Sequence, residues 1–489
     1  MSASRERKKR QEFVASGGTD PKAAREAERK AKERKSNILY GSIGVVFVLV
    51  AAFLVIYNSG VLQRNATAVT IDGENYSAAD YSYYYNTVRR YYTLQYGSYA
   101  DMLVSADQIQ EQTLEQMRFI QAALARAEEE GFTLDEEGEA SIQSQIDAFK
   151  AEASAVGQSY SAYIKQVYGN LVTRSVYESN LRRGTTANLF AQSYQDSLEY
   201  SDEDIQAEYE ANPNDYDLVD YSYISIDASP ETQTDEDGNT IEATEEETTA
   251  AWEDGQALAQ ELLTAWENGE DMETRVEDEE KASYYNTVGG SYNTASYVEW
   301  CFEDGREDGE IHMIEDEDNG RIYIVQFNGR YRDEHHSVNV RHILVTDANL
   351  DEGVEATQEN LEAKAQEILD TWDGTEDGFA QLANEYSQDA GSNTNGGLYE
   401  DVLPGQMVTS FNDWCFDDSR KAGDTGIVYN SGSSYTGAHI MYYVGQGDLI
   451  AWEETVRDAL RSADYSAWET DLLSTVGTAE LQDGASYVS

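Results

Sequence analysis

Two short apolar runs each carry a single histidine. The first, residues 339–345, reads Asn-Val-Arg-His-Ile-Leu-Val and holds His342; the second, residues 437–444, reads Gly-Ala-His-Ile-Met-Tyr-Tyr-Val and holds His439. Runs of this length rich in branched apolar residues are typical of β-strands. The pattern predicts one small α+β domain with a histidine on each of two strands.

The elements between the two runs are two helical patterns, a loop rich in Gly, Ser and Asn, and a Pro-Gly turn. Seven short motifs follow one another in order: Arg-His-Ile-Leu-Val (341–345), Phe-Ala-Gln-Leu-Ala (379–383), Tyr-Ser-Gln-Asp (386–389), Gly-Gly (396–397), Gly-Gln-Met-Val (405–408), Gly-Asp (423–424) and Gly-Ala-His-Ile (437–440). This series closely resembles the parvulin family of peptidyl-prolyl isomerases. The resemblance implies a parvulin domain over residues 334–447.

The resemblance also implies roles for individual residues. His342 and His439 match the paired histidines of the parvulin centre, Asp389 matches the position near the rotating carbonyl, and Thr436 matches a hydroxyl in the histidine network. We therefore expect these four to be the catalytic residues.

Substrate contacts are implied in the same way. Met407 and Phe411 match the floor of the proline pocket, and Gln406 belongs to the Gly-Gln-Met motif beside it. Tyr399 departs from the family, because it stands where a pocket leucine is common. This departure predicts altered activity or specificity at a site otherwise bounded by Met407, Phe411 and Gln406.

The implied reaction needs no cofactor and no metal. Rotation about a prolyl peptide bond faces a barrier of roughly 18–20 kcal/mol from amide resonance, and no bond is broken. An apolar pocket that grips the proline ring, with polar groups placed for the twisted amide, suffices.

An internal repeat precedes this domain. The sequence Glu-Trp-Cys-Phe-Glu-Asp-Gly-Arg at 299–306 matches Asp-Trp-Cys-Phe-Asp-Asp-Ser-Arg at 413–420, and the flanking strand and helix patterns correspond as well. Such a repeat indicates two copies of one domain fold. His342 aligns with Tyr223 and His439 with Tyr323, so residues 216–333 are predicted to form a degenerate parvulin-like domain without isomerase activity. The acidic insertion at 228–249 is expected to be a disordered loop.

Two features suggest metal binding but have simpler interpretations. Residues 315–320, Glu-Asp-Glu-Asp-Asn-Gly, resemble half of a calcium loop, but its twelfth position is Gln326, so a hairpin turn is favoured. His335 and His336 have no nearby cysteine or third histidine, which favours a solvated linker. We predict no metal site.

The N-terminal part of the chain is expected to anchor it in a membrane. Residues 1–37 hold 12 Lys/Arg and 6 Asp/Glu, a net charge of +6, and residues 38–57 are uncharged and apolar for long enough to span a bilayer. The basic flank places the N-terminus in the cytoplasm and the body outside. A cleaved signal peptide ending at Ala66-Thr67-Ala68 is the alternative, but this site lies well past the apolar run.

A helical domain is predicted over residues 58–215. It begins with a short strand and a helix from Ala78 to Tyr96 whose tyrosine-rich face could form a ligand-binding box, although core packing is favoured at helical spacing. The order of elements resembles the N-terminal chaperone module of PrsA- and SurA-type extracytoplasmic foldases. By the same resemblance, the helical segment 448–489 is expected to return and pack on this domain.

Composition excludes some functions. The chain has 489 residues and a net charge of −59; beyond residue 37 the charge is −65, which disfavours binding to nucleic acid. Cys301 and Cys415 are its only cysteines, and they are interpreted as buried thiols, with a bridge between them as the less favoured alternative.

Together these features predict a multidomain α+β protein with a single transmembrane helix, a helical chaperone-like domain, two parvulin-like domains and a C-terminal helical segment. Our preferred hypothesis is a membrane-anchored extracytoplasmic foldase that isomerises Xaa-Pro bonds in unfolded secreted polypeptides. The alternative is a non-catalytic holdase that only binds such chains. A cell-envelope scaffold that binds folded partners is a third, weaker hypothesis.

Overall fold

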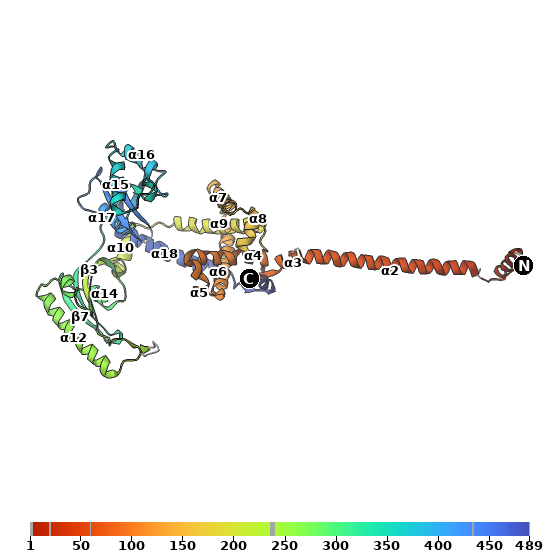
Figure 1. Cartoon of the computed structure of the whole chain (residues 1–489), viewed down its shortest axis with the longest axis horizontal. Helices are drawn as coiled ribbons and strands as arrows, with labels where there is room; N and C mark the ends of the chain where they lie inside the picture. Colours follow the sequence, from red (N-terminus) through yellow and green to blue (C-terminus); the bar gives the residue numbers. More distant parts are fainter. Residues whose placement is uncertain (1–2, 19–20, 59, 235–239, 433–434, 489) are drawn as a thin grey trace. The chain divides into compact units, whose positions relative to one another are not determined.

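The computed structural model describes residues 3–18, 21–58, 60–234, 240–432 and 435–488 (Figure 1). The contacts divide the chain into two compact units. The first, called here the helical unit, comprises residues 1–198 together with 464–489, and the second, called here the sheet unit, comprises residues 199–463. The chain is thus a multidomain α+β protein with a helical N-terminal region and sheet-containing domains after it.

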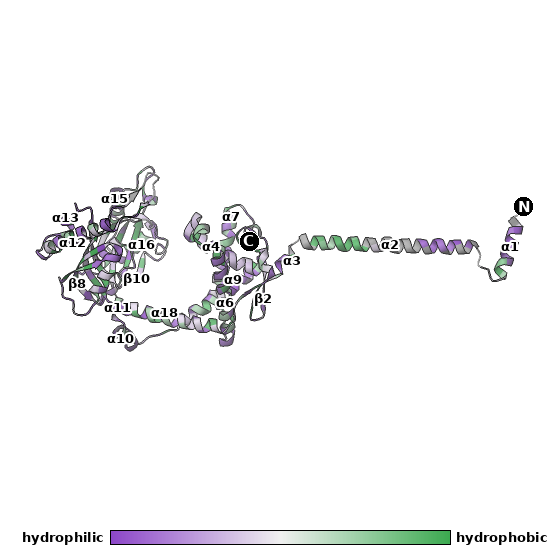
Figure 2. Ribbon diagram, turned by 90° about the horizontal axis from the view of Figure 1, so that it is seen from below, coloured by the Kyte–Doolittle hydropathy of each residue, from purple (hydrophilic) through white to green (hydrophobic). Residues whose placement is uncertain are grey.

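The chain begins with helices α1 (Ala3–Ala15), α2 (Pro21–Asn58) and α3 (Val61–Arg64). Helix α2 is hydrophilic in its first half and hydrophobic in its second half (Figure 2). Within the described residues, no helix meets the length and apolarity that a bilayer crossing requires. The predicted span 38–57 falls partly outside them, because the side chains at 38–41, 43, 44, 56 and 57 are not among those described.

The rest of the helical unit is a helical bundle beside a small antiparallel sheet. The sheet has the strand order β13-β1-β2, formed by Glu480–Leu481, Thr67–Ile71 and Glu74–Ser77. The helices are α4 (Ala78–Tyr96), α5 (Ala100–Leu103), α6 (Ala106–Glu130), α7 (Glu136–Ala155), α8 (Tyr160–Tyr168) and α9 (Arg174–Asp196), together with the end of α18 (Ala451–Ser474), and two short 3₁₀ turns, η1 (Gly97–Tyr99) and η4 (Asp483–Tyr487).

Local signals set the ends of these helices. Ser77 and Ser105 begin α4 and α6 with capping boxes, which satisfy backbone N–H groups that would otherwise lack partners. Gly131 ends α6 in the left-handed conformation at φ 72°. The tyrosine-rich face of α4 is buried in the core, as the packing interpretation predicted.

Segment 464–488 completes this core. Trp468 and Leu472 are buried among the bundle helices, and Trp468 stacks on Tyr194 with ring centroids 4.7 Å apart. Strand β13 pairs with β1, and Gln482 N–H donates to Ala68 O.

The first half of the sheet unit contains α10 (Asp202–Ala211), α11 (Pro213–Tyr216) and a four-stranded antiparallel sheet in the order β6-β3-β8-β7. Its strands are β3 (Leu218–Asp227), β6 (Ala282–Ser291), β7 (Ile311–Asp316) and β8 (Arg321–Tyr331), and its helices are α12 (Glu245–Glu267), α13 (Met272–Val276) and α14 (Ser296–Cys301). A two-stranded hairpin, β4 (Gln233–Thr234) and β5 (Thr240–Ile241), precedes α12.

The second half repeats this plan. Its sheet has the order β10-β9-β12-β11, with β9 (His336–Val345), β10 (Leu398–Val402), β11 (Thr425–Ser431) and β12 (Thr436–Ile450). Its helices are α15 (Gln358–Leu369), α16 (Glu376–Tyr386) and α17 (Thr409–Cys415), with a 3₁₀ turn, η3 (Asp347–Asn349), after β9.

The two halves agree in register as well as in strand order. His342 lies opposite Met441 as Tyr223 lies opposite Val325, and His439 lies opposite Leu344 as Tyr323 lies opposite Ser225. The alignment of the two histidines with two tyrosines therefore holds in three dimensions.

The repeated Trp-Cys-Phe segments also fold alike. In the first, the Arg306 guanidinium lies 4.1 Å above the Trp300 ring and its Nε donates to Trp300 O; in the second, Arg420 lies 4.0 Å above Trp414 and makes the same bond. Cys301 and Cys415 are buried and unbridged, as predicted, and burial raises the pKa of each thiol to about 12.

The acidic segments have definite structure where they are described. The expectation of a disordered loop at 228–249 is wrong at both ends, because β4 and β5 pair there and Thr244 begins α12 with a capping box to Glu247. Residues 235–239 of this insertion lie outside the described residues.

Segment 315–320 is the hairpin between β7 and β8 that was predicted, with a short 3₁₀ turn, η2 (Glu317–Asn319), that ends at Gly320 in the left-handed region. In the described part of the chain, no group of three or more His, Cys, Asp or Glu side chains could hold a metal ion.

Candidate active site

The centre of the candidate site is a pair of imidazoles on adjacent strands. His342 on β9 and His439 on β12 are diagonal neighbours on one face of the sheet, and both are almost fully buried, at 4% and 3% exposure. Their Nδ1 atoms lie 3.0 Å apart, and the rings are nearly parallel at 25°. The antiparallel register of the two strands thus produces the contact that the resemblance to the parvulin family implied.

The outer nitrogen of His342 meets a carboxylate. His342 Nε2 lies 2.9 Å from Asp389 Oδ2 and 3.1 Å from Ser392 Oγ. Asp389 also accepts from the hydroxyls of Ser392 and Tyr399 and from the backbone N–H of Gly391. The hydrogen bond from His342, helped by the other donors, lowers the pKa of Asp389 far below its usual range, so Asp389 is a carboxylate at neutral pH.

The outer nitrogen of His439 meets a phenol. Tyr435 Oη lies 2.9 Å from His439 Nε2. Burial, together with the neighbouring His342, lowers the pKa of His439 to about 3, so this imidazole is neutral under physiological conditions.

With one N–H on each ring, one proton assignment satisfies every contact. An ionised carboxylate only accepts hydrogen bonds, so His342 Nε2 donates to Asp389 and its Nδ1 must accept. His439 Nδ1 then donates to His342, and His439 Nε2 accepts from the hydroxyl of Tyr435. Tyr435, His439, His342 and Asp389 thus form one directed chain of hydrogen bonds, which fixes both ring orientations.

Apolar side chains pack beside the two imidazole rings. The Phe411 ring lies 5.4 Å from the His342 ring and 5.5 Å from the His439 ring, edge-on to both. Phe411 is buried with Met441 and Val340, while Met407 and Tyr399 are partly buried against the same cluster. Tyr399 also lies 5.4 Å from the His342 ring.

Gln406 has a different local role. It is exposed, and its side-chain oxygen accepts from the backbone N–H of Leu403, which stabilises the turn before α17. A contact between Gln406 and substrate stays a prediction.

Thr436 does not join the histidine network, and this prediction is wrong. Side chains alternate between the two faces of a strand, so Thr436, three residues before His439, is directed to the opposite face. It is exposed at the start of β12. The hydroxyl that bonds His439 comes from Tyr435, four residues before it.

Sequence reasoning therefore missed Ser392 and Tyr435. Ser392 follows Asp389 by three residues in the turn after α16, a spacing at which a serine hydroxyl can reach the carboxylate, as its bond to Asp389 shows. For Tyr435, the four-residue spacing along an extended chain was the available signal, because it places the two side chains on the same side.

The corresponding place in the first copy holds tyrosines. The rings of Tyr223 and Tyr323 are 6.3 Å apart, and Tyr297 lies against both, at 4.3 and 4.9 Å. Tyr297 stands four residues before Cys301, as Phe411 stands four before Cys415. Both histidine positions are thus filled by phenols that pack on one another.

Two family models match parts of this chain, and curated foldase proteins are similar to part of it. Residues 322–442 match the family described as PPIC-type PPIASE domain, and residues 29–190 match the SurA-like N-terminal domain. Foldase protein PrsA 3 of Bacillus cereus is 33% identical over 122 residues, which are 25% of this chain and 36% of that protein. Foldase protein PrsA 1 of Listeria innocua is 33% identical over 108 residues, which are 22% of this chain and 30% of that protein.

A crystal structure of foldase protein PrsA from Streptococcus pneumoniae aligns with 83% of this chain and 90% of its own, at 10% identity and a TM-score of 0.28. The chain spans only about a third of the length of the curated relatives named above. At the level of its domains, the chain contains a PPIC-type, parvulin peptidyl-prolyl isomerase domain and a SurA-like N-terminal domain.

Proposed function

We propose that this protein is an extracytoplasmic foldase that binds unfolded secreted polypeptides and accelerates cis/trans isomerisation of their Xaa-Pro bonds. The observation that carries the proposal is the buried His342–His439 pair, held between Asp389 and Tyr435 beside Phe411. PrsA foldases and SurA-like domains among the similar proteins support the same function.

The geometry suits a reaction that twists a bond without breaking it. The barrier of roughly 18–20 kcal/mol comes from amide conjugation, which the transition state has lost. Phe411 and Met407 offer an apolar surface for the proline ring, so that water is excluded while the amide rotates. The hydrogen-bonded chain keeps the polar groups in place, so that little reorganisation accompanies the rotation.

In this proposal the two histidines orient each other and carry no proton during turnover. Asp389 stays ionised next to the rotating carbonyl, and the Tyr399 hydroxyl donates to the same carboxylate oxygen, Oδ2, that His342 Nε2 contacts. Because this tyrosine replaces a common pocket leucine, the proline pocket has a polar edge here.

The test is catalysed exchange of a proline tetrapeptide, followed by NMR exchange spectroscopy with the full chain. We expect His439→Ala to lower the exchange rate constant at least tenfold, because it removes the partner of His342. Tyr323→Ala, at the equivalent position of the first copy, is the matched control and should leave the rate unchanged. A His439→Ala variant that matches wild type would refute the catalytic proposal.

The second candidate function is a holdase without catalysis. It is favoured by one observation, the tyrosines that occupy both histidine positions of the first copy, residues 216–333. We propose that this copy is not an isomerase in either case. Suppression of client aggregation that persists in His439→Ala, with no measurable exchange by wild type, would select the holdase.

We also propose a single-pass membrane anchor at residues 38–57, with residues 1–37 in the cytoplasm. Its support is the uncharged apolar sequence and the basic flank before it. Resistance to extraction at alkaline pH is expected, as is digestion of the body, but not of residues 1–37, by protease added outside intact cells. Release of the protein by alkaline washing would refute the anchor.

A further inference from the structure

We propose that the Tyr399 hydroxyl donates a hydrogen bond to the prolyl nitrogen while the amide is twisted, and so stabilises the transition state of isomerisation. The inference rests on the proposed isomerase function and adds to it a catalytic residue that the family resemblance does not supply, because Tyr399 stands where a pocket leucine is common. Three features of the site point to this role: the crowding of donors on one oxygen of Asp389, the position of the Tyr399 ring, and the space kept open for its hydroxyl.

The prolyl nitrogen accepts a hydrogen bond well only when the amide is twisted. In the planar amide its lone pair is delocalised into the carbonyl, whereas rotation localises the lone pair on nitrogen. A donor directed at the nitrogen therefore binds the transition state more strongly than the substrate, which is the condition for catalysis. A donor directed at the carbonyl oxygen would instead favour the planar amide, because resonance places negative charge on that oxygen.

Most side-chain donors around the imidazole pair are already used within the hydrogen-bonded chain. The N–H groups of His342 and His439 and the hydroxyl of Tyr435 are each donated to the next member of that chain. The hydroxyls of Ser392 and Tyr399 also lie here, and both meet the same carboxylate. Among the described side chains at the imidazole pair, the donor for a substrate is therefore one of these two hydroxyls.

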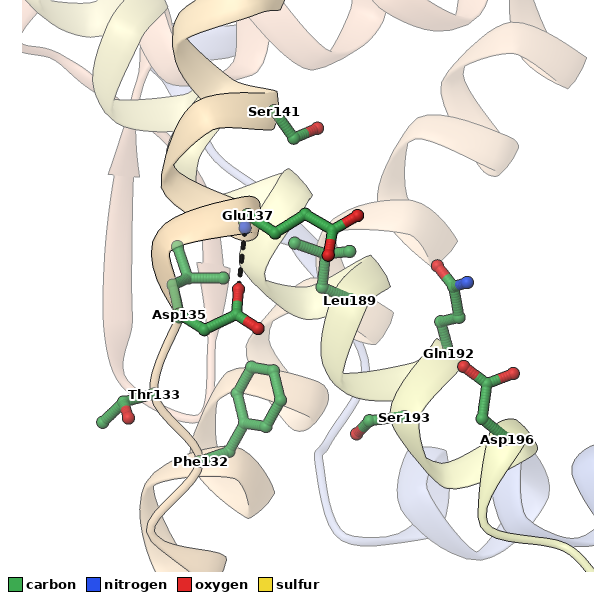
Figure 3. Close-up of a pocket in the computed structure, with 11 residues that line it drawn as sticks. Phe132, Thr133, Asp135, Glu137, Ser141, Leu189, Gln192, Ser193 and Asp196 are labelled. Atoms are coloured by element: carbon green, nitrogen blue, oxygen red, sulfur yellow. Dashed lines mark hydrogen bonds between the residues drawn. The ribbon is translucent and has the colours of Figure 1, made fainter. Parts of the chain in front are cut away.

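Asp389 Oδ2 has more donors than one carboxylate oxygen can fully satisfy. His342 Nε2 and Tyr399 Oη each lie 2.9 Å from it, and the Ser392 hydroxyl donates to it as well. A carboxylate has about two lone-pair sites on each oxygen, so three donors compete for two sites. By contrast, the Asp135 carboxylate at the start of α7 accepts a backbone N–H at 2.8 Å in an ordinary helix cap, as Figure 3 shows. One donor on Oδ2 can therefore turn away while the other two keep Asp389 paired.

Tyr399 is the donor that can turn toward a substrate. His342 and Ser392 are buried, at 4% and 0% exposure, whereas Tyr399 is partly exposed. The Tyr399 ring lies 5.4 Å from the His342 ring and is partly buried against the apolar cluster that contains Phe411. Burial and the hydrogen bond to the carboxylate raise the pKa of Tyr399, so its hydroxyl keeps its proton at neutral pH. This hydroxyl is thus a protonated donor beside the surface proposed for the proline ring.

A glycine keeps space for this hydroxyl. A Cβ at Gly391 would lie 2.9 Å from Tyr399 Oη, closer than a Cβ can come without a shift, and 3.4 Å from Asp389 Oδ1. The backbone at Gly391 is not in the left-handed region, so the conformation of the chain does not itself require glycine there. The Tyr399 hydroxyl is the free end of a side chain and is the atom that would give way. Gly391→Ala therefore displaces this hydroxyl without removing it.

The test is prolyl exchange of a tetrapeptide by the full chain, with kcat and KM measured separately by NMR. Tyr399→Phe removes the hydroxyl and keeps the ring, so we expect kcat to fall about tenfold, as for the loss of one hydrogen bond, with KM unchanged. Gly391→Ala should also lower kcat. Tyr285→Phe makes the same change on β6, which pairs with β3 as β10 pairs with β9, and this control should leave both constants unchanged.

Two further measurements separate a contact with substrate from an effect through Asp389. Ser392→Ala removes the other hydroxyl from the same oxygen, but Ser392 is buried, so we expect a smaller fall in kcat than in Tyr399→Phe. With trifluorotyrosine at position 399, whose phenol is more acidic, kcat should fall as the pH rises past the pKa of that phenol, because a phenolate donates no hydrogen bond. Wild type should stay constant over this range, since the other titratable groups that face the hydroxyl, Asp389, His342 and Tyr435, are the same in both proteins.

Three results would overturn this role for Tyr399: an unchanged kcat in Tyr399→Phe, a fall in Ser392→Ala that is as large or larger, or a constant kcat in the fluorinated protein. Circular dichroism checks the fold of each variant, and the pH profile of the fluorinated protein decides if Tyr399→Phe does not fold. Exchange by wild type that is unaffected in Tyr399→Phe would count against this inference alone. Absence of exchange by wild type would count against the proposed isomerase function itself.

Discussion

At the scale of single residues, the candidate site depends on hydrogen bonds that leave no nitrogen of the two imidazoles unpaired. His342 and His439 share a contact of 3.0 Å, and each outer nitrogen has its own partner, Asp389 or Tyr435. An imidazole held at both nitrogens cannot flip or change tautomer without breaking a bond. The loss of one hydrogen-bond partner should therefore mainly make the imidazole ring more mobile, before it alters the chemistry of the site.

Removal of the Tyr435 hydroxyl tests this. A buried hydrogen bond contributes about 0.5–1.5 kcal/mol, so Tyr435→Phe should lower the prolyl exchange rate roughly three- to tenfold without unfolding the domain. NMR exchange on a proline tetrapeptide measures the effect. Thr436→Val, whose side chain lies on the other face of β12, serves as the control, and an equal loss in both variants would contradict the network.

The lowered pKa of His439, about 3, predicts a dependence of stability on pH. The unfolded state takes up a proton on this histidine below about pH 6.5, whereas the folded state does not until near pH 3. Acidification therefore favours unfolding, by up to about 1.4 kcal/mol per pH unit for one proton. Asp389 also has a lowered pKa, and its contribution to the free energy of unfolding is lost only below about pH 4.

Urea unfolding between pH 7.5 and 4.5 measures this dependence. We expect the free energy of unfolding of wild type to fall below pH 6.5, and His439→Gln to show a shallower decline over the same range. Parallel curves for the two proteins would show that His439 is protonated as readily in the folded state as in the unfolded state.

The strands that carry the two histidines could be predicted because local pattern and strand pairing agree, whereas the catalytic roles of these residues stay predictions. The strands of His342 and His439 were evident from their apolar runs, and the carboxylate of Asp389 from a short motif. Thr436 failed because a one-residue difference in position reverses the face of a strand. Tyr435 escaped notice because it precedes the strand, where alternation is not apparent from the sequence.

At the scale of elements, β9 is held in place by the turn that follows α16. His342 N–H donates to Gly397 O, and Gly397 N–H donates to Ser392 O. Gly397 has φ +72°, and a Cβ there would lie 2.2 Å from His342 O. This glycine permits the close approach of the loop to the histidine strand.

Gly397→Ala should therefore displace β9. We expect a loss of about 2–4 kcal/mol in the free energy of unfolding, from backbone strain and the clash together, and a large fall in prolyl exchange. Gly405→Ala is the control, because it shares the positive φ, at +81°, but has no atom within 4 Å. Urea unfolding and prolyl exchange are measured for both variants. Equal effects would mean that the close approach of Gly397 to His342 O does not itself require glycine.

Element boundaries were less predictable than element types. Helix α12 begins at Glu245, before the end of the segment 228–249 that looked too acidic to fold. Three glutamates in the first turn interact favourably with the positive end of the helix, and the Thr244 cap adds to this. The acidic composition of this segment alone therefore led to the wrong prediction. The effect of acidic residues on a helix depends on where they lie relative to its start.

At the scale of the whole molecule, each unit has its own hydrophobic core, and segment 464–488 belongs to the core of the helical unit. Trp468 is 9% exposed and lies against Phe190 and Tyr194. Arg118 on α6 adds bonds to the carbonyls of Leu473 and Gly477. The return of the chain to this bundle, expected from the resemblance, is visible in these contacts.

Trp468→Ala should lower the stability of the helical unit without affecting the sheet unit. Loss of a buried tryptophan costs about 3–5 kcal/mol, so the unfolding transition of the helical unit should move to lower urea while prolyl exchange by the sheet unit stays unchanged. Far-UV circular dichroism follows the first and NMR exchange the second. A parallel loss of exchange would show that the two units are coupled.

The pairing of β13 with β1 has a consequence for biogenesis. Strand β1, near residue 70, pairs with β13, near residue 480. Because the ribosome makes the chain from its N-terminus, the helical unit cannot be completed until nearly all of the chain has been synthesised. The intervening sheet unit can fold earlier, because its contacts close within residues 199–463. During synthesis, the part of the helical unit that is made first would therefore be completed last, and would remain incompletely folded until then.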